Sequence, residues 1–135
     1  MNLNLSEIFG IQAALSRLTN YQQVVEEKSV ITPFHFSGKT RWNISKNLRV
    51  CDDAVKPWPK VLEGLKEQFK ISADTKQDDQ SFLDFQKEAA KTAEETKDEY
   101  KFLKIPLSEL TNDKNPVSAD VLGVLDRYEL IDESV

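Results

Sequence analysis

The stretch that decides the fold is "ISKNLRVCDDAVKPWPKVLEGLKEQF", residues 44–69. Apolar side chains recur in it at alternating intervals of four and three residues: Ile44, Leu48, Cys51, Val55, Trp58, Leu62, Leu65 and Phe69. This spacing gives a helix one continuous apolar face. It persists across Pro57 and Pro59, although an interior proline costs a helix about 3 kcal/mol. The spacing therefore predicts one helical rod, kinked or tightly broken at Lys56; a true loop there is the alternative.

A second helical arm is expected to fold back onto this rod. Residues 71–81 are polar and resemble a loop, and a thinner helical stripe follows at Phe82, Phe85, Ala89, Ala93, Thr96 and Tyr100. An antiparallel helical hairpin about this loop places Trp58 opposite Ala93, and a large indole facing a small side chain suits dense packing. In the alternative, Trp58 is framed by Pro57 and Pro59 and is presented to a partner protein.

The flanking segments predict the rest of the fold. Helices are expected over about 5–18, capped by Asn4 or Ser6, and over 119–130, capped by Ser118. Strand-like residues at 30–36 and 102–107 should pair antiparallel at the open end of the hairpin, with residues 1–5 as a third strand. The tail, residues 131–135, is expected to fray. The predicted fold is α+β, mostly helical, with residues 1–135 forming a single domain.

Bulk composition narrows the function classes. The formal net charge is −5, which disfavours a general binder of polyanions. With one cysteine, Cys51, the chain cannot form an internal disulfide, and no cysteine cluster for zinc is present. The sequence shows no signal peptide and no apolar run long enough for a membrane span. No cofactor, no metal and no membrane association are therefore expected.

The isolated reactive residues do not form a catalytic pattern. Gly38-Lys39-Thr40 resembles the end of a phosphate-binding loop, but that motif needs a glycine where this chain has Pro33. His35 is the only histidine and is predicted to face solvent, between two inward-facing phenylalanines. Cys51 lies on the apolar face of the rod and is predicted to be buried. A non-enzymatic protein is expected.

One basic stretch provides an alternative function. Lysines and arginines surround an aromatic residue in "KTRWNISKNLR", where the candidate ligand-binding residues are Lys39, Arg41, Trp42, Lys46 and Arg49. Basic residues interleaved with an aromatic can bind single-stranded nucleic acid or a phosphate backbone. They can equally form the polar face of a helix.

As a pattern of spacings, the chain resembles small proteins of tailed bacteriophages and prophages. The resemblance rests on "MNLNLSEIFGIQAALSRL", "ISKNLRVCDDAV…LEGLKEQF", "FLDFQKEAAKTAEETKDEY" and "FLKIPLSEL…VSADVLGVLDRYEL". It implies a protein–protein interaction protein with an assembly or virion-associated role, or an inhibitor of a host defence protein. Phage or host proteins, or a second copy of the chain, are the implied partners. The implied location is the host cytoplasm or the virion.

Overall fold

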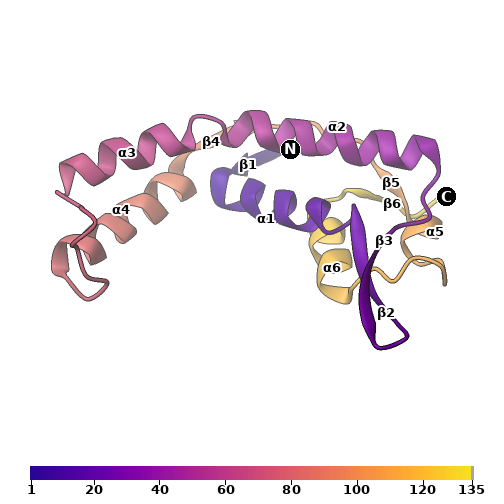
Figure 1. Cartoon of the computed structure of the whole chain (residues 1–135). Helices are drawn as coiled ribbons and strands as arrows, with labels where there is room; N and C mark the ends of the chain where they lie inside the picture. Colours follow the sequence, from indigo (N-terminus) through magenta and orange to yellow (C-terminus); the bar gives the residue numbers. More distant parts are fainter. Residues whose placement is uncertain (135) are drawn as a thin grey trace.

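The computed structural model describes residues 1–134, which form an α+β fold dominated by helices (Figure 1). In chain order the elements are β1 (Asn2–Asn4), α1 (Leu5–Ser16), β2 (Asn20–Val25), β3 (Lys28–Pro33), α2 (Gly38–Val55), α3 (Trp58–Gln68), α4 (Gln80–Glu95), β4 (Lys97–Glu99), β5 (Ile105–Pro106), α5 (Leu107–Leu110), α6 (Ala119–Arg127) and β6 (Ile131–Asp132). The predicted fold class is therefore confirmed at this level. Val135 lies outside the described residues.

Helix α1 is the centre of the core. Its N-terminus is closed by a capping box, in which the Asn4 side chain accepts from the Glu7 N–H and the Glu7 carboxylate accepts from the Asn4 N–H. This satisfies backbone donors that a helix start leaves free. Ile8, Ile11 and Leu15 are fully buried, and α1 packs against both α2 and α6. The predicted N-terminal helix and its cap at Asn4 are confirmed.

The apolar face of residues 44–69 is divided between two helices. Helix α2 ends at Val55 and α3 begins at Trp58, with Pro59 in the first turn, where a helix does not need the missing N–H. Helix α2 packs mainly against α1, whereas α3 packs against α4, which runs back beside it (Figure 1). The return arm thus accompanies only the second part of the rod. It is also shorter than expected, since α4 ends at Glu95 and residues 97–99 form β4.

The predicted strand pairing is wrong. Strand β3 pairs antiparallel with β2, and β5 pairs in parallel with β6, so residues 30–36 and 102–107 do not pair with each other. The N-terminal strand β1 exists, but its partner is β4. Strand β3 pairs with β2 because only a two-residue turn joins them, and so short a loop costs little closure entropy. The tail is also ordered where it forms β6, since Ile131 is buried.

The turn between β2 and β3 is strained. Glu26 and Glu27 form a two-residue turn with φ of 52° and 65°, in the left-handed region that favours glycine and asparagine. Each non-glycine residue there costs roughly 1–2 kcal/mol. The sequence therefore uses an unfavourable turn to place β2 beside β3.

Replacing this turn should stabilise the hairpin. In the double variant Glu26→Asn/Glu27→Gly, the turn acquires the residues that a two-residue hairpin loop prefers, so the local unfolding free energy should rise by about 1 kcal/mol. Native-state hydrogen exchange of the hairpin amides would then slow by roughly fivefold. The exposed variant Glu94→Asn in α4 is a control that should leave these amides unchanged. Unaltered exchange in the double variant would contradict the strained-turn argument.

Candidate functional site

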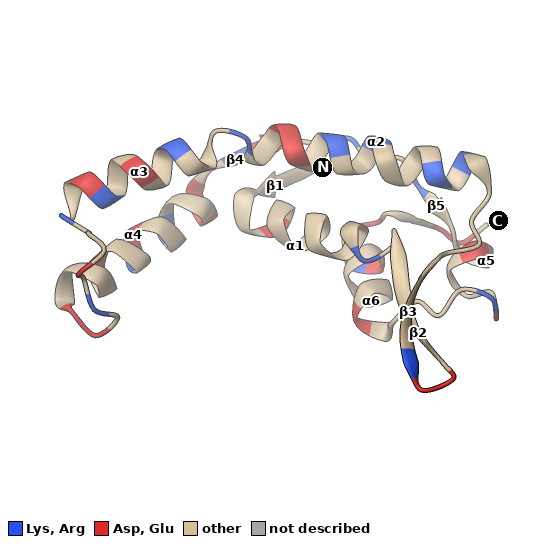
Figure 2. Ribbon diagram, viewed as in Figure 1, with Lys and Arg blue, Asp and Glu red and all other residues tan. Residues whose placement is uncertain are grey.

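The hairpin formed by β2 and β3 projects from the helical body (Figure 1). It exposes apolar side chains on both faces. Residues 20–25 and 29–33 of the hairpin are uncharged, and its charged residues, Glu26, Glu27 and Lys28, lie at the tip (Figure 2). The exposed fractions of its branched apolar residues are Val24 77%, Val25 46%, Val30 43% and Ile31 69%. Cross-strand pairing places Val24 and Ile31 on one face and Val25 and Val30 on the other. An isolated two-stranded hairpin is only marginally stable in water. Apolar side chains exposed together on its faces are typical of a protein–protein interaction site.

The two outer edges of the hairpin differ in hydrogen-bonding capacity. A two-residue turn closes on a hydrogen-bonded pair, here Val25 and Lys28, and such pairs then alternate along the ladder. Gln22 and Val24 of β2 therefore direct their N–H and C=O groups outward. On β3 the outward positions end at Pro33, which has no N–H to donate. The outer edge of β2 is thus the better template for an added strand, and within residues 1–134 no strand pairs with it.

A groove borders β2 and the base of the hairpin. Two adjoining pockets, of 360 and 610 Å³, share Tyr21, Gln22 and Pro116 in their linings. Between them they are lined by every residue from Asn20 to Val24. Thr32 of β3 also lines one of the pockets, and by the strand register Tyr21, Gln23 and Thr32 share one face of the hairpin. The groove therefore lies against β2 and the base of the hairpin, with residues 113, 114 and 116–118 as its opposite wall.

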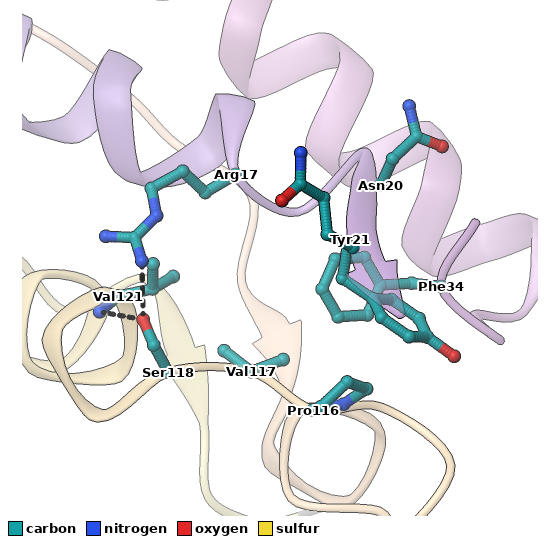
Figure 3. Close-up of a pocket in the computed structure, with 9 residues that line it drawn as sticks. Arg17, Asn20, Tyr21, Phe34, Pro116, Val117, Ser118 and Val121 are labelled. Atoms are coloured by element: carbon teal, nitrogen blue, oxygen red, sulfur yellow. Dashed lines mark hydrogen bonds between the residues drawn. The ribbon is translucent and has the colours of Figure 1, made fainter. Parts of the chain in front are cut away.

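The groove combines an aromatic wall with polar groups (Figure 3). The Tyr21 and Phe34 rings have centroids 5.0 Å apart, and Phe34 stacks on Phe36 at 5.1 Å. On the opposite side, Arg17 Nη2 donates to Ser118 Oγ at 3.1 Å, which leaves further guanidinium donors for a ligand. Such a site can take an apolar side chain while hydrogen-bonding to a peptide backbone.

The wall of the groove is fixed to the core by polar contacts. The Asn115 side chain holds the His35 backbone from both sides, accepting from its N–H at 2.6 Å and donating to its C=O at 3.2 Å. Arg41 donates to the carbonyl oxygens of Phe34 and Phe36 at 2.6 and 3.1 Å. His35 itself is exposed, and the two phenylalanines are buried, as the sequence predicts. These hydrogen bonds hold the base of the hairpin, at residues 34–36, against the helical body.

A cluster of hydrogen bonds around the Glu109 carboxylate connects the segment after the hairpin to α5. Glu109 of α5 accepts from the Ser37 N–H at 2.5 Å, from the Ser37 hydroxyl at 3.0 Å and from the Thr40 hydroxyl. Burial of Glu109 alone would raise its pKa, but these hydrogen bonds and nearby Arg41 outweigh burial and hold the pKa below its usual value. Thr40 is fully buried and Ser37 is exposed, so the cluster joins the start of α2 to α5 at the edge of the core.

The candidate partner-binding residues around Trp58 lie at the junction of α2 and α3. Pro57 and Pro59 are exposed, whereas Trp58 is half-buried. The Trp58 ring meets the Phe9 ring of α1 edge to face, with centroids 6.0 Å apart. The indole therefore contributes to internal packing, through a contact with α1 that the sequence reasoning missed.

The candidate nucleic-acid residues divide into two groups. Lys39, Trp42, Lys46 and Arg49 are exposed on α2. Arg41 is also partly exposed, but its guanidinium is used in the internal contacts to the phenylalanine carbonyls. The structure thus brings together a basic face of four residues on α2, while Arg41 has a structural role.

Cys51, the remaining candidate nucleophile, is a buried thiol of α2. Burial, with a smaller contribution from the charge of Asp52, raises the pKa of the Cys51 thiol to about 12, so the nucleophilic thiolate is disfavoured. The predicted burial of Cys51 is confirmed. Among residues 1–134, no three histidine, cysteine, aspartate or glutamate side chains converge as a metal site requires. None of the described helices is both long and apolar enough to traverse a bilayer.

Comparisons of this chain with protein-family models, with curated proteins and with solved structures gave no match.

The β2–β3 hairpin is the main feature that sequence reasoning missed. The signal that could have revealed it is the pair of uncharged runs, residues 20–25 and 29–33, rich in β-branched residues and flanking a short charged segment. The turn carries Glu26-Glu27 in place of the usual Asn-Gly, so the strongest local indicator of a hairpin is missing.

Proposed function

We propose that this chain is a non-enzymatic protein–protein interaction protein that binds an extended segment of its partner along the outer edge of β2. The added strand would hydrogen-bond to the outward N–H and C=O groups of Gln22 and Val24. Alternate side chains of the partner would enter the groove between β2 and residues 113–118. This is recognition by strand addition, in which the backbone provides affinity and side-chain pockets provide specificity.

The observation that carries the proposal is the open, uncharged edge beside exposed branched residues. Folded proteins commonly protect strand edges with charges, prolines or covering segments. Strand β3 has Pro33 at its outer edge, whereas β2 has no such protection. Val24 and Ile31 are more than two-thirds exposed on one face, and the side chains of a strand bound at the β2 edge would lie next to Val24.

The class of partner protein is proposed from the resemblance to small phage proteins. It favours a phage protein during assembly or in the virion, with inhibition of a host defence protein as the alternative. Both roles require a binding surface and no reactive centre. The open edge of β2 suits either role equally.

Proline substitutions at the strand edges test the binding mode. Peptides selected from a random library against the full chain should bind it, and Gln22→Pro should weaken binding about tenfold, since it removes one outward donor. Proline is tolerated at an edge position whose N–H faces outward, so the hairpin should persist. Ser29→Pro makes the same change on the outer edge of β3 and serves as the matched control. Affinity is measured by fluorescence anisotropy of the labelled peptide.

Two results would contradict the proposal. One is a library that yields no binding peptide for the wild-type chain. The other is an equal loss of affinity in Gln22→Pro and Ser29→Pro, which would show that the edge of β2 has no special role. Retained binding in Ser29→Pro alone supports docking on β2.

A further inference from the structure

A second surface, separate from the hairpin, lies on the exposed side of α2. Lys39, Trp42, Lys46 and Arg49 follow one another at intervals of three, four and three residues, which places them on one helix face. We refer to these four residues as the basic face of α2. All four are exposed, and no acidic residue occurs between Ser37 and Cys51. Lys and Arg segments recur along this helix (Figure 2).

Trp42 is the unusual member of the basic face. Its side chain is 58% exposed, although a tryptophan is normally largely buried. Lys46 Nζ lies 5.5 Å from the centroid of the indole ring, in a cation–π contact that holds the two side chains together. The chain thus presents a large aromatic surface to solvent directly beside positive charges.

The backbone of residues 103–104 runs beside α2. The Asn43 side chain donates to the carbonyl oxygen of Lys104 at 3.0 Å, which fixes residues 103–104 alongside the helix. Lys39 and Lys46 lie four residues before and three residues after Asn43, so both occupy the same flank of the helix. Lys104 is exposed, and its charge acts on Asp132 of β6. The cation that borders Trp42 is Lys46 of the same helix.

We propose that the basic face of α2 binds single-stranded nucleic acid. Lys39, Lys46 and Arg49 would contact successive phosphates, and an unpaired base would stack on the exposed Trp42 ring. Charge complementarity identifies a polyanion as the ligand, and the exposed ring favours unpaired bases over a duplex, whose bases are already stacked. The net charge of −5 disfavours a general attraction for polyanions, so binding requires a local cluster of cations such as this face. The inference is independent of strand binding by β2.

Fluorescence anisotropy with a labelled oligothymidine of about 15 nucleotides tests the inference on the full chain, since single-strand sites span roughly 4–16 nucleotides per domain. Binding at low salt is expected, with log K falling against log salt at a slope of about −2, because three phosphate contacts each contribute about −0.7. Trp42→Ala should weaken binding about tenfold through lost stacking, and Trp42→Phe should retain most of it. Lys46→Gln should make the slope shallower by about 0.7.

Matched lysines on another helix provide the control. Lys87 and Lys91 are exposed on α4, and Lys87→Gln or Lys91→Gln changes the net charge by the same amount as Lys46→Gln. Neither should alter binding. The inference is overturned by no binding at low salt, or by equal losses in the Lys46 and α4 variants. Duplex DNA or polyglutamate binding as tightly as the single strand would also overturn it, since either shows that the ring does not read unpaired bases.

Discussion

Replacing Asn47 with alanine is expected to lower the free energy of unfolding by about 2–4 kcal/mol. The Asn47 side chain is 1% exposed and contacts both backbone groups of Leu103. It donates to the carbonyl oxygen at 2.8 Å and accepts from the N–H at 2.8 Å. Alanine would leave a partly buried donor and acceptor without partners, and it would also create a cavity beside α2.

Asn43→Ala is the matched control, one helical turn away. Asn43 donates to the Lys104 carbonyl oxygen, but its own side-chain oxygen is buried without a partner among the described residues. Removing that orphaned acceptor offsets part of the lost hydrogen bond, so the cost should be about 1 kcal/mol. Urea denaturation of the two variants measures the difference. Equal losses of unfolding free energy in Asn47→Ala and Asn43→Ala would show that the two hydrogen bonds to Leu103 stabilise the fold no more than the single bond to Lys104.

Replacing Glu109 with glutamine is expected to lower the free energy of unfolding by about 1.5–3 kcal/mol at neutral pH. The Glu109 carboxylate accepts from the Ser37 N–H, the Ser37 hydroxyl and the Thr40 hydroxyl. Glutamine offers only one acceptor oxygen, and its amide brings donors into a site already rich in donors. The start of α2 would then lose its tie to α5.

The same variant should change the response to pH. The hydrogen bonds to Glu109, together with Arg41, outweigh the effect of burial and hold its pKa below the usual value in the folded chain. The stabilisation is therefore fully present above the unfolded-state pKa of about 4.3, and it is lost as the pH falls through the lower folded-state pKa. The gap between wild type and Glu109→Gln should shrink as the pH falls below about 4.

Urea denaturation over a series of pH values measures this gap. Glu94→Gln in α4 removes an exposed carboxylate and makes the same change in net charge, so it controls for general effects of charge. It should leave stability within about 0.5 kcal/mol of the wild type at each pH. A gap for Glu109→Gln that stays constant across the series would contradict the assigned role of the carboxylate.

Local sequence determined the starts of two helices of this protein and the junction between two others. The capping residues Asn4 and Ser118 are named by the sequence and are found at the starts of α1 and α6. Pro57 and Pro59 mark the junction of α2 and α3, because proline restricts the residue before it and has no N–H to donate. These features depend on a few neighbouring residues, so a linear pattern is sufficient to predict them.

Tertiary structure alone decided what covers each apolar face. The spacing from Ile44 to Phe69 shows that a face exists, but it does not show that α1 covers α2 while α4 covers α3. Burial of apolar area is non-directional, so one stripe fits several partners equally well. The parallel pairing of β5 with β6 likewise joins segments separated in sequence, and no local preference encodes it.

The two binding surfaces show the same division. The sequence supplied the residues of the basic face of α2, because a helix converts spacing directly into a shared face. The fold then removed Arg41 from the ligand-binding set by turning its guanidinium toward the carbonyl groups of Phe34 and Phe36. The groove beside β2 needs residues 20–24 and 113–118, which are distant in the chain, to meet. Only packing brings such walls together, since an open strand edge is a property of the whole sheet.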